Sequence, residues 1–355
     1  MRTILLSLGC AMLMAQNPPQ NPPQEPGDQF KVSITTTNVL VPVTVQDRNH
    51  NTIAGLTPYD FRLFDNGRPQ KISQDLAQHP ISLVVVIQAN NDVEQILPQI
   101  VKQASTIESL VVGADGEVAV IGFDHRIQTL TGFTSDDSQI DLAFKKLKPG
   151  SYSAALNDAV LSGITLLKSR PAERRRVLLI ISQNRDKGSS AKAREVLEEA
   201  EVANVIMYSM NVSQLVEALT AKAQPNRPDN RPPGAEHLDG GWISNPTIQS
   251  QTNVGNWVPA FKDVFDAAKG VFVKDPLDVF TNYTGGRQCG FKTTKAIGSC
   301  VEQIGDELHS QYLLSYAPAK ETQAEGGFHH IVVEVLKPGL AVRAREGYWA
   351  AAKTQ

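Results

Sequence analysis

This sequence of 355 residues lacks an excess of charge of either sign. Its formal net charge at pH 7 is -3. Such a value excludes the broad electrostatic attraction that holds nucleic acids or anionic lipids, so we predict no nucleic-acid partner. Hydrophobic residues make up 41% and charged residues 20%, a balance typical of a globular chain rather than a disordered or fibrous one.

An apolar run long enough to cross a membrane is also missing. The run over residues 4–14 is about half of the roughly 20 residues that a membrane-spanning helix needs. It follows the positive Arg2 and ends before Ala15, which is the layout of a signal peptide over residues 1–15. We therefore expect an exported chain, periplasmic or extracellular, whose mature form has no transmembrane helix. Cys10 offers lipoprotein anchoring as an alternative, which we disfavour because cutting there would leave a very short apolar core.

Motifs that organise a catalytic site are missing as well. The seven histidines show no metal-ligand spacing and are interpreted as surface residues. The sequence has neither the Gly-x-Ser-x-Gly elbow nor the Gly-x-x-x-x-Gly-Lys phosphate loop. The arginine run over residues 174–176 is predicted to be a solvated turn. We therefore predict that the protein is not an enzyme, and a hydrolase with an unrecognised site stays an alternative.

The mature chain begins with segments that favour a linker and then a small β-rich unit. Residues 16–29 repeat Asn-Pro-Pro-Gln, a composition typical of an extended tether. Residues 30–78 alternate β-branched and polar residues, which indicates half-buried strands. Asn66-Gly67 inside this unit predicts a tight hairpin turn.

The middle of the chain, residues 79–311, alternates apolar strands with helical spacing. Such alternation predicts a doubly wound, mostly parallel sheet with helices on both faces, an α/β fold. A long irregular insertion interrupts it at residues 220–256. The predicted strands cover residues 81–87, 118–123, 177–181 and 205–210, and the predicted helices cover residues 93–111, 154–168 and 190–203.

The C-terminal residues 312–355 return to strands. We expect them to pack with residues 30–78 as an antiparallel β-rich domain in which the α/β domain is inserted. Cys289 and Cys300 remain after export and are predicted to form a disulfide, with two buried thiols as the alternative.

Motifs along the chain, in this order, resemble the von Willebrand factor A-related domain proteins of acidobacteria. They are VPVTVQD (41–47), GLTPYDF (55–61), DNGRPQKI (65–72), LHSQYLLSYAP (308–318) and VRAREGY (342–348). The resemblance implies a non-catalytic binding fold. In type A domains generally, one edge of the sheet carries a metal-ion-dependent adhesion site, in which Mg²⁺ is held by Asp-x-Ser-x-Ser, a Thr and a further Asp. An open coordination position then takes an acidic side chain of the partner.

The residues at these positions differ from the adhesion pattern. Carboxylates have become amides and the threonine has become alanine, so we predict no metal, with a weak Mg²⁺ or Ca²⁺ site on Asp92 as the alternative. The predicted partner-binding edge comprises Gln88, Asn90, Asp92, Ser153, Ala154, Gln183 and Asp186.

The sequence therefore predicts an exported protein-interaction or adhesion-type module with a degenerate adhesion site and no cofactor. One alternative is a structural subunit of an envelope or secretion assembly. An exposed apolar patch on the β-rich unit would favour that alternative, and a deep polar pocket would favour a hydrolase. The identity of the protein partner and the oligomeric state do not follow from the sequence.

Overall fold

The computed structural model describes residues 38–48, 51–75, 79–109, 113, 115–220, 275–318 and 327–350, which all belong to one unit of the chain. The predicted signal peptide, Cys10, the linker over residues 16–29 and, apart from Thr220, the insertion over residues 220–256 lie outside these residues. Within the described ranges, none of the helices has the length and apolar character needed to cross a membrane.

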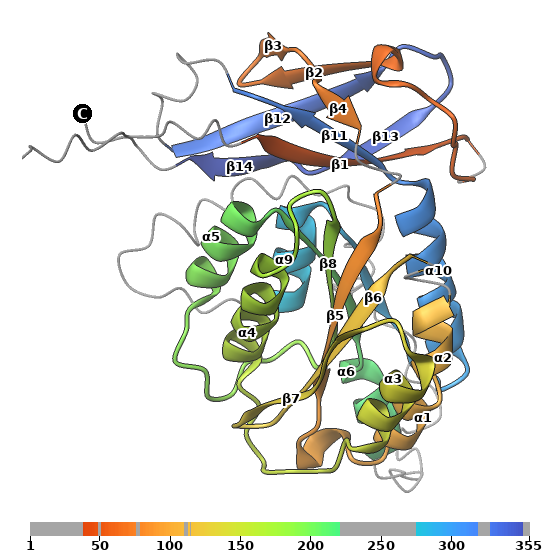
Figure 1. Ribbon diagram of the computed structural model, residues 1–355, viewed down its shortest axis with the longest axis vertical. Coiled ribbons are helices and arrows are strands. Elements are labelled where there is room, and N and C mark those ends of the chain that lie inside the picture. The colour runs from red at the N-terminus through yellow and green to blue at the C-terminus, as the bar shows by residue number, and fades with distance from the viewer. Residues whose placement is uncertain are drawn as a thin grey trace, which may run out of the picture. The chain divides into compact units, whose positions relative to one another are not determined.

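A six-stranded sheet lies at the centre of the α/β domain, in the order β10-β9-β8-β5-β6-β7 (Figure 1). All neighbouring pairs are parallel except β6 and β7. This sheet confirms the predicted fold class and each of the predicted buried strands. The strands are β5 (Ile81–Gln88), β6 (Glu117–Phe123), β7 (Ile127–Thr134), β8 (Arg175–Ser182), β9 (Val205–Asn211) and β10 (Gln288–Gly290).

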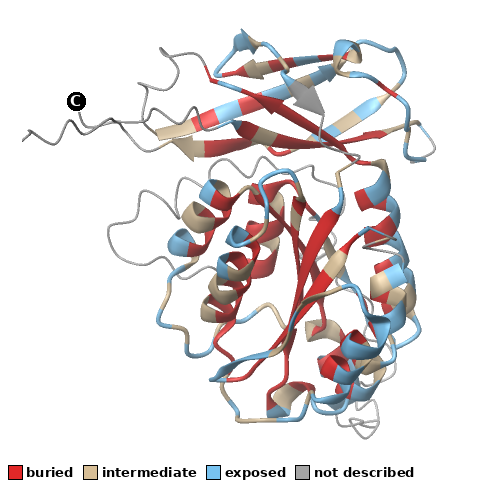
Figure 2. Cartoon of the chain, in the orientation of Figure 1, coloured by how far each residue is buried: buried red, intermediate tan, exposed pale blue. Residues whose placement is uncertain are grey.

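Helices cover both faces of this sheet because alternate side chains of each central strand point to opposite faces. In β5, Leu83, Val85 and Ile87 belong to one apolar core, whereas Val84 and Val86 belong to the other. The first core is covered by α1 (Leu97–Val101), α2 (Ala104–Ile107), α3 (Asp137–Lys145), α6 (Ser213–Thr220) and α10 (Ala296–Ser310). The second is covered by α4 (Leu156–Lys168), α5 (Ala193–Ala203) and α9 (Pro276–Thr284). Figure 2 shows the buried strands between these two layers.

Helix α4 confirms the helix predicted over residues 154–168, and it packs closely on the sheet. A Cβ atom added to Gly163 would lie 2.5 Å from Leu178 Cδ1 and 3.2 Å from Val86 Cγ2. Glycine at this position therefore lets the helix approach β5 and β8.

The single helix predicted over residues 93–111 is wrong. The chain forms a 3-10 turn, η2 (Asn91–Val93), and then the two short helices α1 and α2. Pro98 lies in the first turn of α1, where its missing N–H costs nothing, and it cannot continue a preceding helix. Gln103, at φ -91° and ψ 0°, separates α1 from α2. The apolar spacing nevertheless predicted the buried positions, because Ile96, Ile100, Ala104 and Ile107 are all buried.

Two antiparallel sheets form the β-rich part, and strands from both ends of the described chain contribute to each. One has the order β13-β1-β11-β4 and the other β14-β12-β2-β3. Asn66 and Gly67 both have positive φ between β2 and β3, which confirms the predicted hairpin. The strands are β1 (Val39–Gln46), β2 (Phe61–Asp65), β3 (Arg68–Gln70), β4 (Gln74–Asp75), β11 (Tyr312–Tyr316), β12 (Gly327–Val335), β13 (Ala341–Ala344) and β14 (Gly347–Ala350), with the short helix η1 (Pro58–Asp60) before β2.

A polar cluster in the core of the β-rich part contradicts the surface prediction for one histidine, His329, whereas His125, His309 and His330 are exposed as predicted. His329 is 1% exposed, and its Nδ1 lies 2.9 Å from Asp65 Oδ1. Asp65 also accepts hydrogen bonds from the hydroxyls of Tyr316 at 2.7 Å and Tyr348 at 3.0 Å. The buried carboxylate thus has its hydrogen-bond partners, which is the condition for burying it at all.

Two residues of the arginine run that was predicted to be a solvated turn, Arg175 and Arg176, instead begin strand β8, and Arg174 directly precedes it. Arg175 is 3% exposed, and its Nη1 donates to Leu308 O at 2.9 Å. Arg174 Nη2 donates to Ile81 O at 2.9 Å. The prediction failed because carbonyl groups at the amino end of the sheet offer acceptors that the sequence does not reveal.

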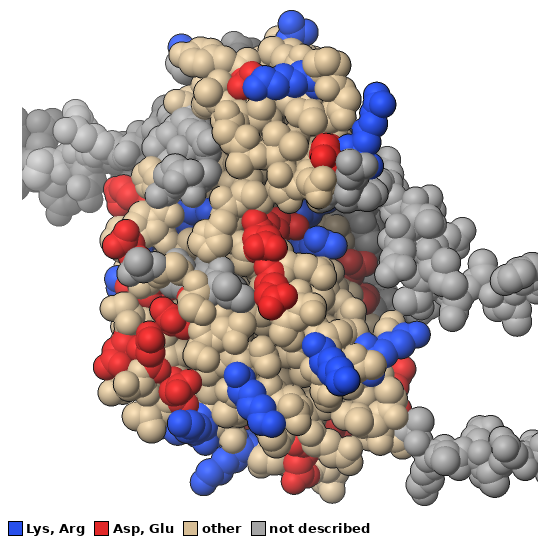
Figure 3. Space-filling model, turned by 90° about the vertical axis from the view of Figure 1, so that its right-hand side faces the viewer, with Lys and Arg blue, Asp and Glu red and all other residues tan. Residues whose placement is uncertain are grey.

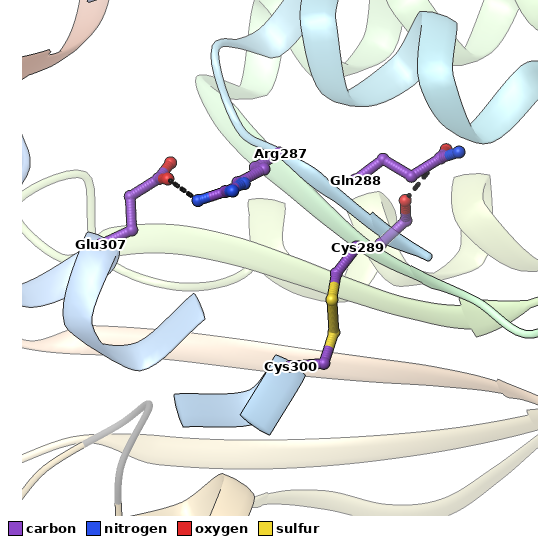
Figure 4. The surroundings of a disulfide bond; sticks show 6 residues. Arg287, Gln288, Cys289, Cys300 and Glu307 are labelled. Carbon is purple, nitrogen blue, oxygen red and sulfur yellow. Dashed lines mark hydrogen bonds and ion pairs between the residues drawn. A yellow bond between two sulfur atoms is a disulfide. The ribbon is translucent and has the colours of Figure 1, made fainter. Parts of the chain in front are cut away.

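A disulfide joins Cys289 of β10 to Cys300 of α10, as the sequence predicted (Figure 4). The bond ties the short edge strand β10 to a helix of the first core. Beside it, Arg287 pairs with Glu307 of the same helix at 3.6 Å. The last strand of the sheet is therefore attached to α10 by a covalent and an ionic contact.

Candidate functional site

The loops at the carboxyl ends of β5, β6 and β8 meet the loop before α4. We call this region the carboxyl edge and define it as residues 88–92, 124–126, 151–154 and 183–189. Strands β5 and β8 are neighbours, but the helices that follow them pack on opposite faces. Ligands of open α/β sheets bind at such a switch point. The predicted loops do come together here, since Asn91 N donates to Ser151 O at 2.9 Å and Ala154 pairs with Lys187.

Three amide side chains lie at the centre of the carboxyl edge, two of them almost completely buried. Gln88 is 1% exposed and Asn90 0%. Gln88 Nε2 donates to Asn90 Oδ1 at 2.8 Å and to Gln183 Oε1 at 3.1 Å. Gln88 Oε1 accepts from Ser182 Oγ at 2.8 Å and from Gln183 N at 2.7 Å. The Gln88 amide therefore uses both of its N–H groups and two acceptor positions inside the protein.

These contacts do not fit the metal ion that the adhesion-site resemblance implies. Mg²⁺ and Ca²⁺ need several oxygen atoms turned toward one point. Gln88 instead turns its NH₂ group toward the oxygens of Asn90 and Gln183, and Ala154 has no side-chain oxygen to add. Across the part of the chain that the structure describes, no group of three or more His, Cys, Asp or Glu is placed to hold a metal. The side chains bridge one another directly, where an ion would otherwise bridge them.

Lys187 links the loops of the carboxyl edge. Its backbone forms a two-way bridge with Ala154, with N···O distances of 3.1 and 2.8 Å. Its carbonyl also accepts a hydrogen bond from Ser153 Oγ. Its ammonium pairs with Asp92 at 2.9 Å, so the predicted anion Asp92 already has a cation from this chain. The next residue, Gly188, has φ +125° and packs against Ser153, where a Cβ atom would lie 2.6 Å from its hydroxyl.

Asp186, the other predicted anion, holds the beginning of α4. Its Oδ1 accepts from Leu156 N at 2.8 Å and from Ser189 Oγ at 2.6 Å, and Asn157 Nδ2 lies 3.4 Å from its Oδ2. A carboxylate is favoured at a helix N-terminus, because the first backbone N–H groups there lack intrahelical partners. The structure thus gives Asp186 a capping position, separate from the amides around Gln88.

Sequence reasoning missed the residues that follow β6. Asp124 is 5% exposed and accepts hydrogen bonds from Arg126 N at 2.6 Å and from Ser151 N at 3.0 Å. Burial by itself would raise the pKa of Asp124, but the hydrogen bonds from Arg126 and Ser151 outweigh it and hold the pKa well below its usual range. The signal was present in the sequence, because Asp124 directly follows a predicted parallel strand and so had to lie at this edge.

Asp124, His125 and Ser151 resemble a hydrolytic triad only in composition. His125 Nδ1 lies 2.7 Å from Ser151 Oγ, and the same nitrogen lies 3.4 Å from Asp124 Oδ2. A triad needs the serine on one ring nitrogen and the carboxylate on the other, so that the base takes a proton while its partner orients it. With both contacts on Nδ1, the histidine joins two loops and does not activate the hydroxyl.

The surface of the carboxyl edge carries one large aromatic side chain, Tyr152, which is 77% exposed. Its carbonyl accepts a hydrogen bond from Asn90 Nδ2 at 3.3 Å. The tyrosine is thus connected through its backbone to the buried amides. An exposed tyrosine held on an anchored loop is a side chain of the kind enriched at protein interfaces.

Comparisons with known proteins find similarity of fold among solved structures. No family model and no curated protein sequence matches the chain. The von Willebrand factor domain of the pilus tip protein Mfa5 from Porphyromonas gingivalis is 14% identical, with a TM-score of 0.28 over 30% of this chain and 39% of that one. BatB from Bacteroides thetaiotaomicron is 12% identical, with a TM-score of 0.40 over 63% of this chain and 98% of that one.

Proximal thread matrix protein 1 from the mussel byssus is 10% identical, with a TM-score of 0.44 over 72% of this chain and 51% of that one. The match thus spans about half of the mussel protein and less of the pilus protein. These values describe a distant likeness of fold and carry no information about individual residues of the carboxyl edge. The link to acidobacterial proteins stays a prediction. The architecture of the α/β part, a mostly parallel six-stranded sheet with helices on both faces, is consistent with a von Willebrand factor A-like fold.

Proposed function

We propose that this chain is an exported, non-catalytic interaction module that binds a protein partner at the carboxyl edge without a metal ion. The observation that carries the proposal is the direct hydrogen bonding of Gln88 to Asn90 and Gln183 at the position of the adhesion site. Hydrogen bonds between these amide side chains hold the loops of the carboxyl edge in place without a ligand. This arrangement therefore favours a preformed protein-binding surface over a metal centre.

Export is supported mainly by the sequence. The charged start, the short apolar run and the small residue before the Pro-rich segment are typical of a signal peptide. The disulfide between Cys289 and Cys300 supports the same location, because disulfides persist in oxidising compartments.

A structural subunit of an envelope assembly is the second candidate, and one observation favours it. Exposed apolar side chains occur on the β-rich part: Tyr59 is 91% exposed, Leu336 50% and Val332 41%. Val332 lies on β12 opposite Phe64 of β2, so part of this apolar surface is on the face of a sheet. Such a surface suits a lasting contact with another protein.

A hydrolase has less support. The cavity lined by Pro42, Glu201, Thr284 and Arg345, with their neighbours, has a volume of about 10 Å³, which is room for one water molecule. It lies at the other end of the sheet from the carboxyl edge, beside the end of α5. A substrate pocket would be far larger.

Calorimetric titration with Mg²⁺, Ca²⁺ and Mn²⁺ tests whether the edge is free of metal. We expect no binding heat at millimolar ion, either in the parent protein or in Asp92→Ala. Binding that disappears in Asp92→Ala would contradict the proposal and restore the adhesion site.

Photo-crosslinking tests whether the carboxyl edge binds a partner. A photoreactive amino acid would replace Tyr152 in the cells that make the protein, and Leu142 of α3, which is 51% exposed, would carry the matched control. We expect a protein adduct from position 152 that is absent from position 142. Adducts at neither position, or equally at both, would reject the edge as the binding site.

A further inference from the structure

We propose that Lys187 takes the place of the metal ion as the fixed positive charge of the carboxyl edge and binds a carboxylate of an acidic segment on the partner. The inference rests on the proposed function, because it names the partner chemistry of the same edge. It departs from the adhesion pattern in one respect: the charge that attracts the partner's carboxylate is an ammonium of this chain.

The first argument is the position of Lys187. A metal ion in an adhesion site would join the loop after β5, the loop before α4 and the loop after β8. Lys187 joins the same loops through the Asp92 carboxylate, the Ala154 backbone and the Ser153 hydroxyl. Its backbone is therefore fixed before any partner arrives, which lowers the entropy lost on binding.

The second argument is the exposure of its ammonium. The Lys187 side chain is 48% exposed, although Asp92 lies 2.9 Å from its Nζ. An ammonium group has three N–H donors, and one carboxylate oxygen on one side does not use them all. A partner carboxylate can approach from the solvent side and share the ammonium with Asp92.

The third argument is the direction in which the remaining charges face. Arg126 is 59% exposed although its guanidinium pairs with Asp124 at 3.1 Å, and Arg185 is also exposed, so cationic side chains line the surface of the edge. The carboxylates of Asp124, Asp158 and Asp186 are buried or half-buried and accept hydrogen bonds from backbone N–H groups. The positive and negative formal charges of the carboxyl edge nearly cancel, but the cationic groups are the more exposed, so a partner would contact mainly these.

The face over α1, α2, α3 and α10 provides a contrast. Figure 3 shows that it carries acidic and basic side chains interspersed among large uncharged areas. It therefore gives no comparable preference for a partner of either sign. The carboxyl edge combines outward cations with the exposed Tyr152, a combination suited to an acidic segment that also carries an apolar side chain.

Peptide selection on the full mature protein tests the inference. A display library of short random peptides would be selected on the parent protein, and each binder would be resynthesised with its Asp and Glu replaced by Asn and Gln. Binding would be measured with EDTA on the parent, Lys187→Gln, Tyr152→Ala and Lys168→Gln. Lys168 is the matched control, because it forms a similar half-exposed pair with Glu199 at 2.7 Å on the far end of α4.

We expect the selected peptides to be acidic and to bind Lys187→Gln about tenfold or more weakly than the parent protein. Their Asn and Gln forms should lose a similar amount of affinity for the parent protein. Binding to Lys168→Gln should be unchanged. Peptides that depend on Tyr152 but neither on Lys187 nor on their own carboxylates would overturn this inference and leave the proposed function standing. Peptides that bind Lys187→Gln and Tyr152→Ala as tightly as the parent protein would overturn the inference and the proposed function together.

Discussion

The two ends of the six-stranded sheet use charge in opposite ways. At the amino end, ion pairs connect the helices to the β-rich part, and the Arg345–Glu201 pair among them is largely buried. Arg345 pairs with Glu201 at the end of α5, and Arg343 of β13 pairs with Glu307 of α10. At the carboxyl end, the most deeply buried polar groups are uncharged amides, and the cations lie outside.

This difference shows how one sheet can serve for attachment at one end and for binding at the other. Arg345 is 5% exposed and also donates to the carbonyls of Leu40 and Gly347, so its charge is fully used within the protein. Such a contact holds two parts of the chain in one arrangement. The carboxyl edge joins its loops through amides and through carboxylates and ion pairs, and the cationic side chains of Lys187 and Arg126 remain about half-exposed.

Breaking the Arg345–Glu201 pair at the amino end should produce the largest loss of stability. In Glu201→Gln the guanidinium of Arg345 stays buried without its anion, and we expect the free energy of unfolding to fall by about 3–5 kcal/mol. Urea unfolding would measure the change. Glu199→Gln, which removes the exposed partner of Lys168, is the control and should cost less than about 1 kcal/mol. Equal losses in both variants would mean that the amino end is not a buried contact.

Restoring the adhesion-site residues should bring charge into the carboxyl end. The triple variant Gln88→Asp, Ala154→Thr, Gln183→Asp loses the amide donors and places carboxylates beside the Asn90 oxygen. We expect it to be less stable by about 2–4 kcal/mol without metal and to regain part of this with Mg²⁺. The parent protein should show no Mg²⁺ effect in the same urea titration. Equal stabilisation of the parent would disprove the metal-free interpretation.

Asp278, in the first turn of α9, should make stability depend on pH. Burial, and then repulsion by Asp275, raise its pKa to about 6. The folded state therefore holds this proton more tightly than the unfolded state, so the stability that Asp278 contributes is fully present below about pH 4 and is lost as the pH rises through about 6. Asp278→Asn should remove this slope and add about 1–2 kcal/mol at pH 7.

Urea unfolding between pH 4 and pH 7 would test the Asp278 prediction. Asn keeps an oxygen that can accept the hydrogen bond from Asn282 Nδ2, which lies 2.9 Å from Asp278 Oδ1. Glu302→Gln, at an exposed position on α10, is the control and should leave the slope unchanged. An unaltered slope in Asp278→Asn would assign the pH dependence to another group.

The smallest effect on stability should come from Lys187. Its pair with Asp92 is half-exposed, so Lys187→Gln should change the free energy of unfolding by about 0–1 kcal/mol. The same variant is expected to lose affinity for acidic peptides. A loss of stability as large as that of Glu201→Gln would show that Lys187 holds the fold and would remove the distinction between the two ends.

Much of the fold could be predicted from local patterns. Continuous Val, Ile and Leu runs identify β5 and β8 because both faces of a central strand are buried. Strand β7 was not predicted because it is an edge strand with exposed or half-exposed residues such as Thr129 and Thr131, so it has no apolar run. The helix predicted over residues 93–111 is two short helices in the structure. The prediction failed because apolar spacing indicates which residues are buried but not where the backbone turns.

The candidate site was predictable only in part, for a similar reason. The loops that contain Gln88 and Gln183 could be named because the carboxyl ends of parallel strands must share one edge, and the loop that contains Ala154 was named from the resemblance to type A domains. The contacts of Lys187 with Asp92 and of Asp124 with Ser151 could not be predicted, because the partners lie 95 and 27 residues apart along the chain.

The sequence by itself determined the alternation of strands and helices, the positions of the loops and the replacement of carboxylates by amides. These are properties of residue type and spacing, which local physical chemistry fixes. Only the tertiary structure decided that Gln88 satisfies its neighbours without an ion and that Lys187 pairs with Asp92. Hydrogen bonds and ion pairs depend on distances of about 3 Å between groups far apart in the chain, and no local pattern specifies such distances.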